Sequence, residues 1–232
     1  MVSDWWRKNT SLSIPKQCHL CGLNKAGNGT RWCSTCLTLF SKVPRCQRCG
    51  ITTPTTVEQC GQCLTTPPSW HRLYCVGDYN FPLSRYVHQL KYSKQFWFAR
   101  DLASLLTHHI EQPAPIIASV PLHWTRTLSR GFNQSALLSH YLAKSLNVSA
   151  HPHMFSRTRA TPYQQGLTKK ERRQNLHNAF KLRQQPHANH VAILDDVVTT
   201  GSTVQHLCQL LLEVGVERID IYCICRTPEP LQ

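Results

Sequence analysis

The sequence predicts an α/β protein in which helices cover a parallel sheet and a small cysteine-rich metal module comes first. Two observations indicate this fold class. After about residue 70, short β-branched runs alternate with amphipathic segments, the order typical of a parallel sheet covered by helices. Before residue 70, the chain is rich in cysteine pairs and turn residues and shows no sustained apolar period. We therefore expect a zinc-binding module at 1–70 and an α/β domain at 71–232.

Eight of the 12 cysteines form four C-x-x-C pairs. Each pair supplies two thiolates from one tight turn, and two pairs complete a tetrahedral zinc site. In a reducing compartment this spacing favours metal over disulfides, and a thioredoxin-like redox pair would need only one motif. The expected zinc ligands are Cys18, Cys21, Cys33, Cys36, Cys46, Cys49, Cys60 and Cys63.

The spacing leaves open whether the chain holds one or two structural zinc ions, and whether the pairs combine sequentially or interleave. The module's role also has two interpretations, purely structural or a nucleic-acid surface. The residues that would suit such a surface are Arg31, Trp32, Arg45 and Arg48. The other four cysteines lie in apolar segments and are expected to be buried packing residues: Cys75, Cys208, Cys223 and Cys225.

The first half of the α/β domain begins after a proline-containing linker at 65–70. A short strand is predicted at 73–79, followed by helical apolar spacing over 83–110. A β-branched strand follows at 116–120, and an amphipathic helix at 131–146.

The C-terminal third repeats this alternation. A strand is predicted at 191–194, a helix at 202–214 that ends at Gly215, and a strand at 219–224. In an open α/β sheet, ligands bind at the carboxyl ends of the strands. Residues directly after 194 are therefore candidates for the site.

The stretch VAILDDVVTTGSTV, residues 191–204, places two carboxylates at the end of a buried strand. Successive residues of a strand face opposite sides of the sheet, so Asp195 and Asp196 should have different functions. A loop of small residues, Thr199 to Thr203, then opens a helix and offers N–H groups, hydroxyls and the positive end of a helix dipole, which suit a phosphate. Carboxylates beside such a loop fit a sugar phosphate, with the ribose hydroxyls donating to them.

This stretch resembles the 5-phosphoribosyl 1-pyrophosphate (PRPP) motif of type I phosphoribosyltransferases. The resemblance implies that fold, and a catalytic role for Asp195 and Asp196 in stabilising an oxocarbenium-like state. It also implies Mg²⁺ carried by the pyrophosphate and ribose oxygens. The implied PRPP-binding residues are Asp195, Asp196, Val197, Val198, Thr199, Thr200, Gly201, Ser202 and Thr203. Arg126 and Arg130 follow the turn at 119–121, where this fold would hold pyrophosphate, and guanidinium groups suit phosphate oxygens.

Two further segments are similar to the ComF/GntX family, whose pattern includes R-G-F-N-Q, here residues 130–134. The second segment, 157–180, resembles the family pattern R-x-x-x-x-x-Q-x-x-L-x-x-x-x-R-x-x-N-x-x-x-A-F: it fits from Gln164 to Phe180, and its arginine, Arg157, lies one residue earlier than the pattern has it. The resemblance implies an N-terminal zinc finger and a cytoplasmic protein needed for using imported DNA, in natural transformation or as a nutrient. The basic stretch from Arg157 to Arg183 is either a solvated loop or a lid over an anionic ligand.

The formal net charge of +14 favours a polyanionic partner, although a basic surface can also serve solubility alone. We expect PRPP and single-stranded DNA as ligands, with an uptake or helicase protein as a further partner of the zinc module. The alternative is an active phosphoribosyltransferase of nucleotide metabolism without DNA contact. No apolar stretch approaches the roughly 18 residues of a membrane span, and the N-terminus lacks a signal-type apolar region.

Overall fold

The computed structural model describes residues 17–25, 30–122, 131–158 and 179–227. The chain divides into two compact units, Met1–Ser41 and Lys42–Gln232. The division falls well before the predicted boundary near residue 70, because residues 42–70 hydrogen-bond to the sheet unit, as in the bond from the Leu73 N–H to the Gln47 carbonyl at 2.9 Å. That residues 1–70 act as one module stays a prediction.

In the first unit, α2 (Ser34–Leu37) and the 3₁₀ helix η1 (Thr38–Phe40) follow the second cysteine pair. Trp32 is buried, with 1% of its surface exposed, and its ring lies 4.9 Å from that of Phe40. Burial of Trp32 favours the structural interpretation of this residue over base stacking.

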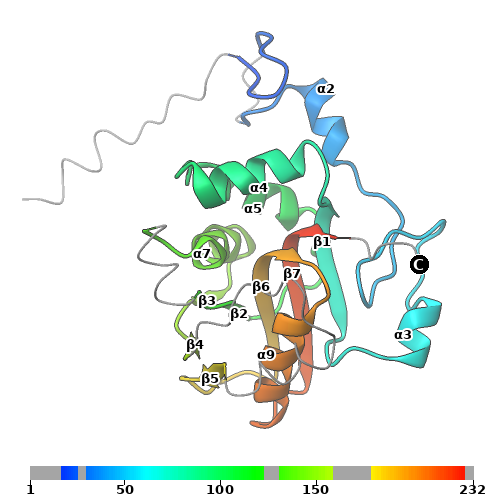
Figure 1. The fold of residues 1–232 in the computed structure, drawn as a ribbon, viewed down its shortest axis with the longest axis vertical. Helices are drawn as coiled ribbons and strands as arrows, with labels where there is room; N and C mark the ends of the chain where they lie inside the picture. The colour runs from blue at the N-terminus through cyan, green and yellow to red at the C-terminus, as the bar shows by residue number, and fades with distance from the viewer. Residues whose placement is uncertain (1–16, 26–29, 123–130, 159–178, 228–232) are drawn as a thin grey trace, which may run out of the picture. The chain divides into compact units, whose positions relative to one another are not determined.

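The second unit contains a five-stranded parallel sheet of order β1-β7-β6-β2-β3 (Figure 1). The strands are β1 (Arg72–Asp78), β2 (Ile116–Ser119), β3 (Ser149–His151), β6 (His190–Val198) and β7 (Arg218–Arg226). A separate antiparallel pair joins β4 (Phe155–Arg157) to β5 (Phe180–Leu182). The predicted α/β class with a parallel sheet is confirmed.

Helices cover both faces of the sheet (Figure 1). Helix α9 (Ser202–Leu212) packs on one face, where its Leu207 and Leu211 share an apolar cluster with Ile193 and Ile221. Strand residues of the opposite parity point away from α9. On that side lie α4 (Leu83–Tyr92), α5 (Phe98–Thr107) and α7 (Gln134–Leu146). A short helix, α3 (Gly61–Thr65), precedes β1.

The helical apolar spacing predicted over 83–110 corresponds to two helices, α4 and α5. They are separated where Lys94 takes a left-handed conformation with φ of 54°, which ends a helix. The predicted strand at 191–194 continues to Val198, so Asp195 and Asp196 lie within β6.

Local contacts define the ends of two helices. Asn133 caps α7, since its side-chain oxygen accepts hydrogen bonds from the N–H groups of Ser135 and Ala136. Gly215 has a φ of 86° and follows the end of α9. The four cysteines outside the C-x-x-C pairs are all buried. Within the described residues, no helix combines the length and apolar character that a bilayer span requires.

Candidate functional site

Two cysteine clusters form from consecutive pairs, so the structure selects the sequential grouping over the interleaved one. In each cluster the four sulfur atoms lie within 4.8 Å of one another. We call them the first cysteine cluster (Cys18, Cys21, Cys33, Cys36) and the second cysteine cluster (Cys46, Cys49, Cys60, Cys63). Sulfur–sulfur distances are 3.9 Å for Cys21–Cys33 and 3.7 Å for Cys49–Cys60. A tetrahedron with Zn–S bonds of about 2.3 Å has sulfur–sulfur edges of about 3.8 Å, so both sets fit zinc.

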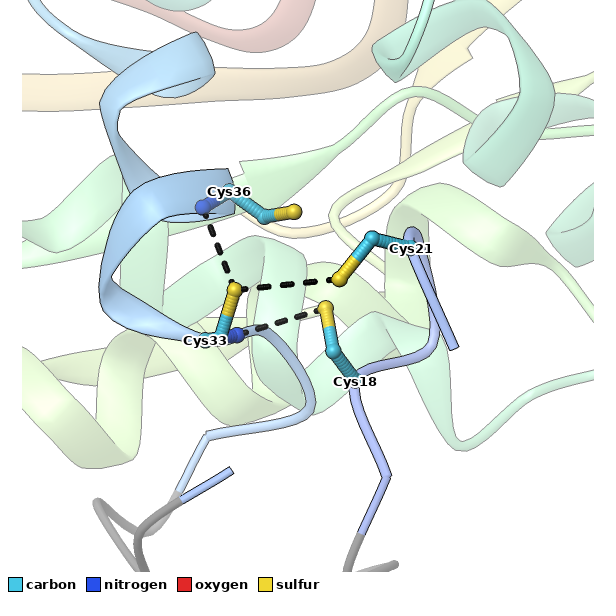
Figure 2. A group of neighbouring side chains, drawn as sticks. All are labelled: Cys18, Cys21, Cys33 and Cys36. Atoms are coloured by element: carbon cyan, nitrogen blue, oxygen red, sulfur yellow. Dashed lines mark hydrogen bonds between the residues drawn. The ribbon is translucent and has the colours of Figure 1, made fainter. Parts of the chain in front are cut away.

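Both clusters are built in the same way. In each, a C-x-x-C-G turn faces a C-x-x-C pair on a short helix, and the glycines Gly22 and Gly50 both have a φ of 75°. Backbone N–H groups point at sulfur: Cys33 N–H donates to Cys18 Sγ at 3.3 Å (Figure 2), and Cys60 N–H donates to Cys46 Sγ at 3.2 Å. Burial raises the pKa of Cys18, but N–H groups from Cys21 and Cys33 outweigh it and lower that pKa to about 6. These donors favour thiolates, the form that binds metal.

Two of the basic residues that would suit a nucleic-acid surface, Arg45 and Arg48, make structural contacts in the second unit. Arg45 pairs with Asp78 at 2.7 Å, and this ion pair is largely buried. Arg48 donates from Nη2 to the Pro68 carbonyl at 3.0 Å. These contacts favour a structural role for both arginines.

A hollow lies at the carboxyl end of β6, beside the N-terminus of α9. Gly201, the N-cap of α9, has a φ of 76°, and the hydroxyls of Thr200 and Ser202 are 2.8 Å apart. Of the nine PRPP-binding residues predicted within 195–203, all but Asp196 line the hollow, as does Val204. Arg126 and Arg130 lie outside the described residues, as do residues 159–178 of the predicted lid.

Asp195 faces this hollow and is partly buried. Its Oδ1 accepts hydrogen bonds from the Ser135 hydroxyl at 3.0 Å and from the Asp196 N–H at 2.9 Å. Burial, and next the charge of Asp196, raise the pKa of Asp195 to about 7, although Lys91 and these two donors oppose the shift.

Asp196 does not line the hollow and is 3% exposed. Its Oδ1 lies 2.8 Å from the Lys91 ammonium of α4, and among the described residues its buried Oδ2 has no hydrogen-bond partner. Burial alone would lower the pKa of Lys91, but the negative charges of Asp196 and then Asp195 have the larger effect and raise it above its usual value. Lys91 therefore stays a cation. The expectation that the two carboxylates have different surroundings is met.

Ser135 and Lys91 were not predicted. Helical spacing offered a signal for Lys91, which comes four residues after the buried Val87 and hence lies near the same helix face. Ser135 directly follows the R-G-F-N-Q segment, but only the tertiary fold brings α7 to the end of β6.

Curated relatives resemble the chain over nearly its whole length. DNA utilization protein YhgH of Salmonella typhi is 40% identical over 225 residues, 93% of this chain and 99% of that protein. The protein of that name from Escherichia coli strain K12 is 40% identical over 230 residues, with the same coverage. Competence protein F of Haemophilus influenzae is 38% identical over 216 residues, 88% of this chain and 93% of that protein.

The chain belongs to the ComF/GntX family. The phosphoribosyl transferase domain model matches residues 134–231, the part that holds α7, β6, the hollow and α9. With the parallel sheet and its covering helices, this match gives the ComF/GntX chain the type I phosphoribosyltransferase fold.

Proposed function

We propose that this chain binds PRPP with Mg²⁺ at the hollow at the end of β6, and that it acts in the use of imported DNA by binding single-stranded DNA in the cytoplasm. The observation that carries the PRPP part is the position of Asp195 in a hollow that it shares with the small-residue loop opening α9. The named relatives support the link to DNA.

Each part of PRPP has a counterpart in this arrangement. The phosphate loop, Thr199–Thr203, offers backbone N–H groups and hydroxyls to the 5′-phosphate at the positive end of α9. Asp195 accepts from ribose hydroxyls, and Asp196 adds negative charge close to the sugar. Mg²⁺ enters with the ligand, bound by its pyrophosphate and ribose oxygens. The two cysteine clusters each hold a structural zinc ion.

Calorimetry with PRPP and Mg²⁺ tests this proposal. The wild-type chain should release or absorb heat, and PRPP at 100 times its dissociation constant should stabilise the fold by about 2.7 kcal/mol. Asp195→Asn should weaken binding about tenfold or more, because hydrogen bonds to a charged acceptor contribute about 1.5–3 kcal/mol.

Glu213→Gln is the matched control, since Glu213 is an exposed carboxylate beyond the far end of α9. Absence of both heat and stabilisation in the wild type would refute PRPP binding. Pyrophosphate release that needs a nucleobase and is insensitive to added DNA would favour the alternative, an active enzyme of nucleotide metabolism.

The second unit offers a surface that suits single-stranded DNA. Exposed aromatic and basic side chains lie just before, along and after α4, and we call them the α4 stripe: Phe81, Arg85, His88, Tyr92, Lys94 and Phe96. Arg85, His88 and Tyr92 are three and four residues apart and so share one helix face. Aromatic rings stack on bases without sequence preference, and arginine and lysine attract phosphates. Residues 1–70 are the proposed docking site for an uptake or helicase protein.

A further inference from the structure

One buried side chain connects the second cysteine cluster to the phosphate loop. Arg226, the last residue of β7, is 5% exposed. Its Nε donates to the Cys49 carbonyl at 2.9 Å. Its Nη1 donates to the Val198 carbonyl at 3.2 Å and also to the Thr199 carbonyl. The guanidinium group therefore joins the backbone of a metal-ligating turn to the backbone that enters the phosphate loop.

These contacts set the direction of the loop's N–H groups. In a planar trans peptide, the carbonyl of one residue and the N–H of the next point in opposite directions. Because Arg226 holds the carbonyls of Val198 and Thr199, the N–H groups of Thr199 and Thr200 point away from it. Both threonines line the hollow, so Arg226 favours the conformation in which anion-binding donors are available.

The charge of Arg226 also relates it to the second cysteine cluster. Among the described residues, no carboxylate lies within ion-pair distance of this buried guanidinium. A buried charge without an opposite charge is costly. Four thiolates around one Zn²⁺ leave a net negative centre beside it. Because zinc binds cysteine as thiolate, metal binding in this cluster provides the negative charge opposite Arg226.

Two more contacts connect the same regions. Trp70 donates from Nε1 to the Arg48 carbonyl at 2.6 Å, and its ring lies against Gly201, where an added Cβ would come within 2.9 Å of Trp70 Cη2. Gln205, in the first turn of α9, accepts a hydrogen bond of 3.1 Å from the Ser69 N–H and donates one of 2.5 Å to the Ser69 hydroxyl. The segment that follows the second cysteine cluster therefore supports both the loop and the helix start.

We infer that metal bound by the second cysteine cluster fixes the phosphate loop in its anion-binding conformation through the positioning residues Arg226 and Trp70. This inference rests on the proposed PRPP function, because it assigns control of that site to the metal. Affinity for PRPP should then depend on the second cluster more than on the first.

Matched ligand substitutions test the metal dependence. Cys60→Ser and Cys33→Ser each remove a partly buried cysteine that precedes a short helix, in the second and the first cluster respectively. Amide exchange should accelerate in Cys60→Ser at Gln205 and Thr227, whose N–H groups bond the carbonyls of Gly201 and Val198. The Val120 amide, bonded to Leu194 within the sheet, reports global unfolding. Cys33→Ser should leave all three amides unchanged.

Affinity is measured in the same proteins by calorimetry with PRPP and Mg²⁺. We expect at least about tenfold weaker binding in Cys60→Ser, the effect of one lost charge-assisted hydrogen bond. Equal affinity and equal exchange in Cys60→Ser and the wild type would overturn the inference while leaving PRPP binding intact. A wild type that does not bind PRPP would refute the proposed function, and the exchange at Gln205 and Thr227 would still decide the coupling.

Substitutions of the positioning residues decide the matter if Cys60→Ser unfolds. Arg226→Lys keeps the charge but lacks the fork that reaches both backbones. Trp70→Phe keeps an aromatic ring beside Gly201 but loses the bond to the Arg48 carbonyl. Both should retain wild-type zinc content and show weaker PRPP binding with faster exchange at Gln205. Unchanged affinity and exchange in both would overturn the inference.

Discussion

Asp195 and Asp196 are neighbours in the sequence and have opposite surroundings in the fold. Asp195 lines the hollow, with its pKa raised to about 7, whereas Asp196 is buried against Lys91. Side chains of neighbouring strand residues face opposite sides of the sheet, so this difference can be predicted once the sequence indicates a strand. The partners Ser135 and Lys91 come from α7 and α4, which are distant in the sequence, so no local pattern could assign them.

The raised pKa of Asp195 predicts a pH dependence of PRPP binding. Ribose hydroxyls donate to the ionised carboxylate, so affinity should strengthen as pH rises through about 7, by about tenfold between pH 6 and pH 8. Calorimetry at these pH values measures this, and Asp195→Asn shows the part due to titration of PRPP itself. Identical profiles in the two proteins would contradict the prediction.

The same shift affects stability with the opposite sign. The folded protein binds the Asp195 proton more tightly than the unfolded chain, so its contribution is present below pH of about 4 and is lost as pH rises to about 7. Binding therefore improves over the pH range in which this residue's contribution to folding declines.

Among the elements, α4 has two faces with separate uses. Its buried face holds Val87 and Leu90 against the sheet unit and directs Lys91 to Asp196. Its other face carries the α4 stripe, in which Tyr92 is 60% exposed. One helix thus places the DNA surface that we propose close to the end of β6.

The α4 stripe predicts a measurable loss of DNA binding. Tyr92→Ala should weaken binding of an oligo-dT by about fivefold or more, since stacking of one base contributes about 1–3 kcal/mol. Arg85→Ala should reduce the salt dependence of binding, because one phosphate contact is lost. Fluorescence anisotropy over a salt series measures both. Leu212→Ala, which removes an exposed apolar side chain from α9, should have no effect; equal losses in all three variants would rule out a specific stripe.

For the whole molecule, the two sulfur tetrads predict the metal content. Elemental analysis of the purified chain should find two zinc ions per chain, because both sets have the sulfur spacing of a tetrahedral site. Removing one ligand by Cys33→Ser or Cys60→Ser should lower the content to about one ion. A single ion in the wild type would show that one tetrad stays empty.

Which features of this molecule can be predicted from the sequence depends on how far apart along the chain the interacting residues lie. The cysteine spacing and the alternation of strands and helices are local, and the structure confirms the cysteine tetrads and the parallel sheet that they predict. The break at Lys94 leaves no mark in the apolar spacing, because apolar residues continue on both sides of it. Arg226 and Trp70 were missed because their partners Cys49 and Gly201 are far away along the chain. Such contacts exist only after the sheet has formed.

The position of β1 at the border of the sheet has a consequence for fragments of this chain. On one side β1 pairs with β7, and on the other its Leu73 N–H bonds to Gln47 in the turn between Cys46 and Cys49. A fragment starting at residue 71 would present this apolar strand to solvent with donors and acceptors unpaired. An unpaired strand edge of that kind can pair with a strand of another chain, so residues 42–70 also protect the protein from aggregation.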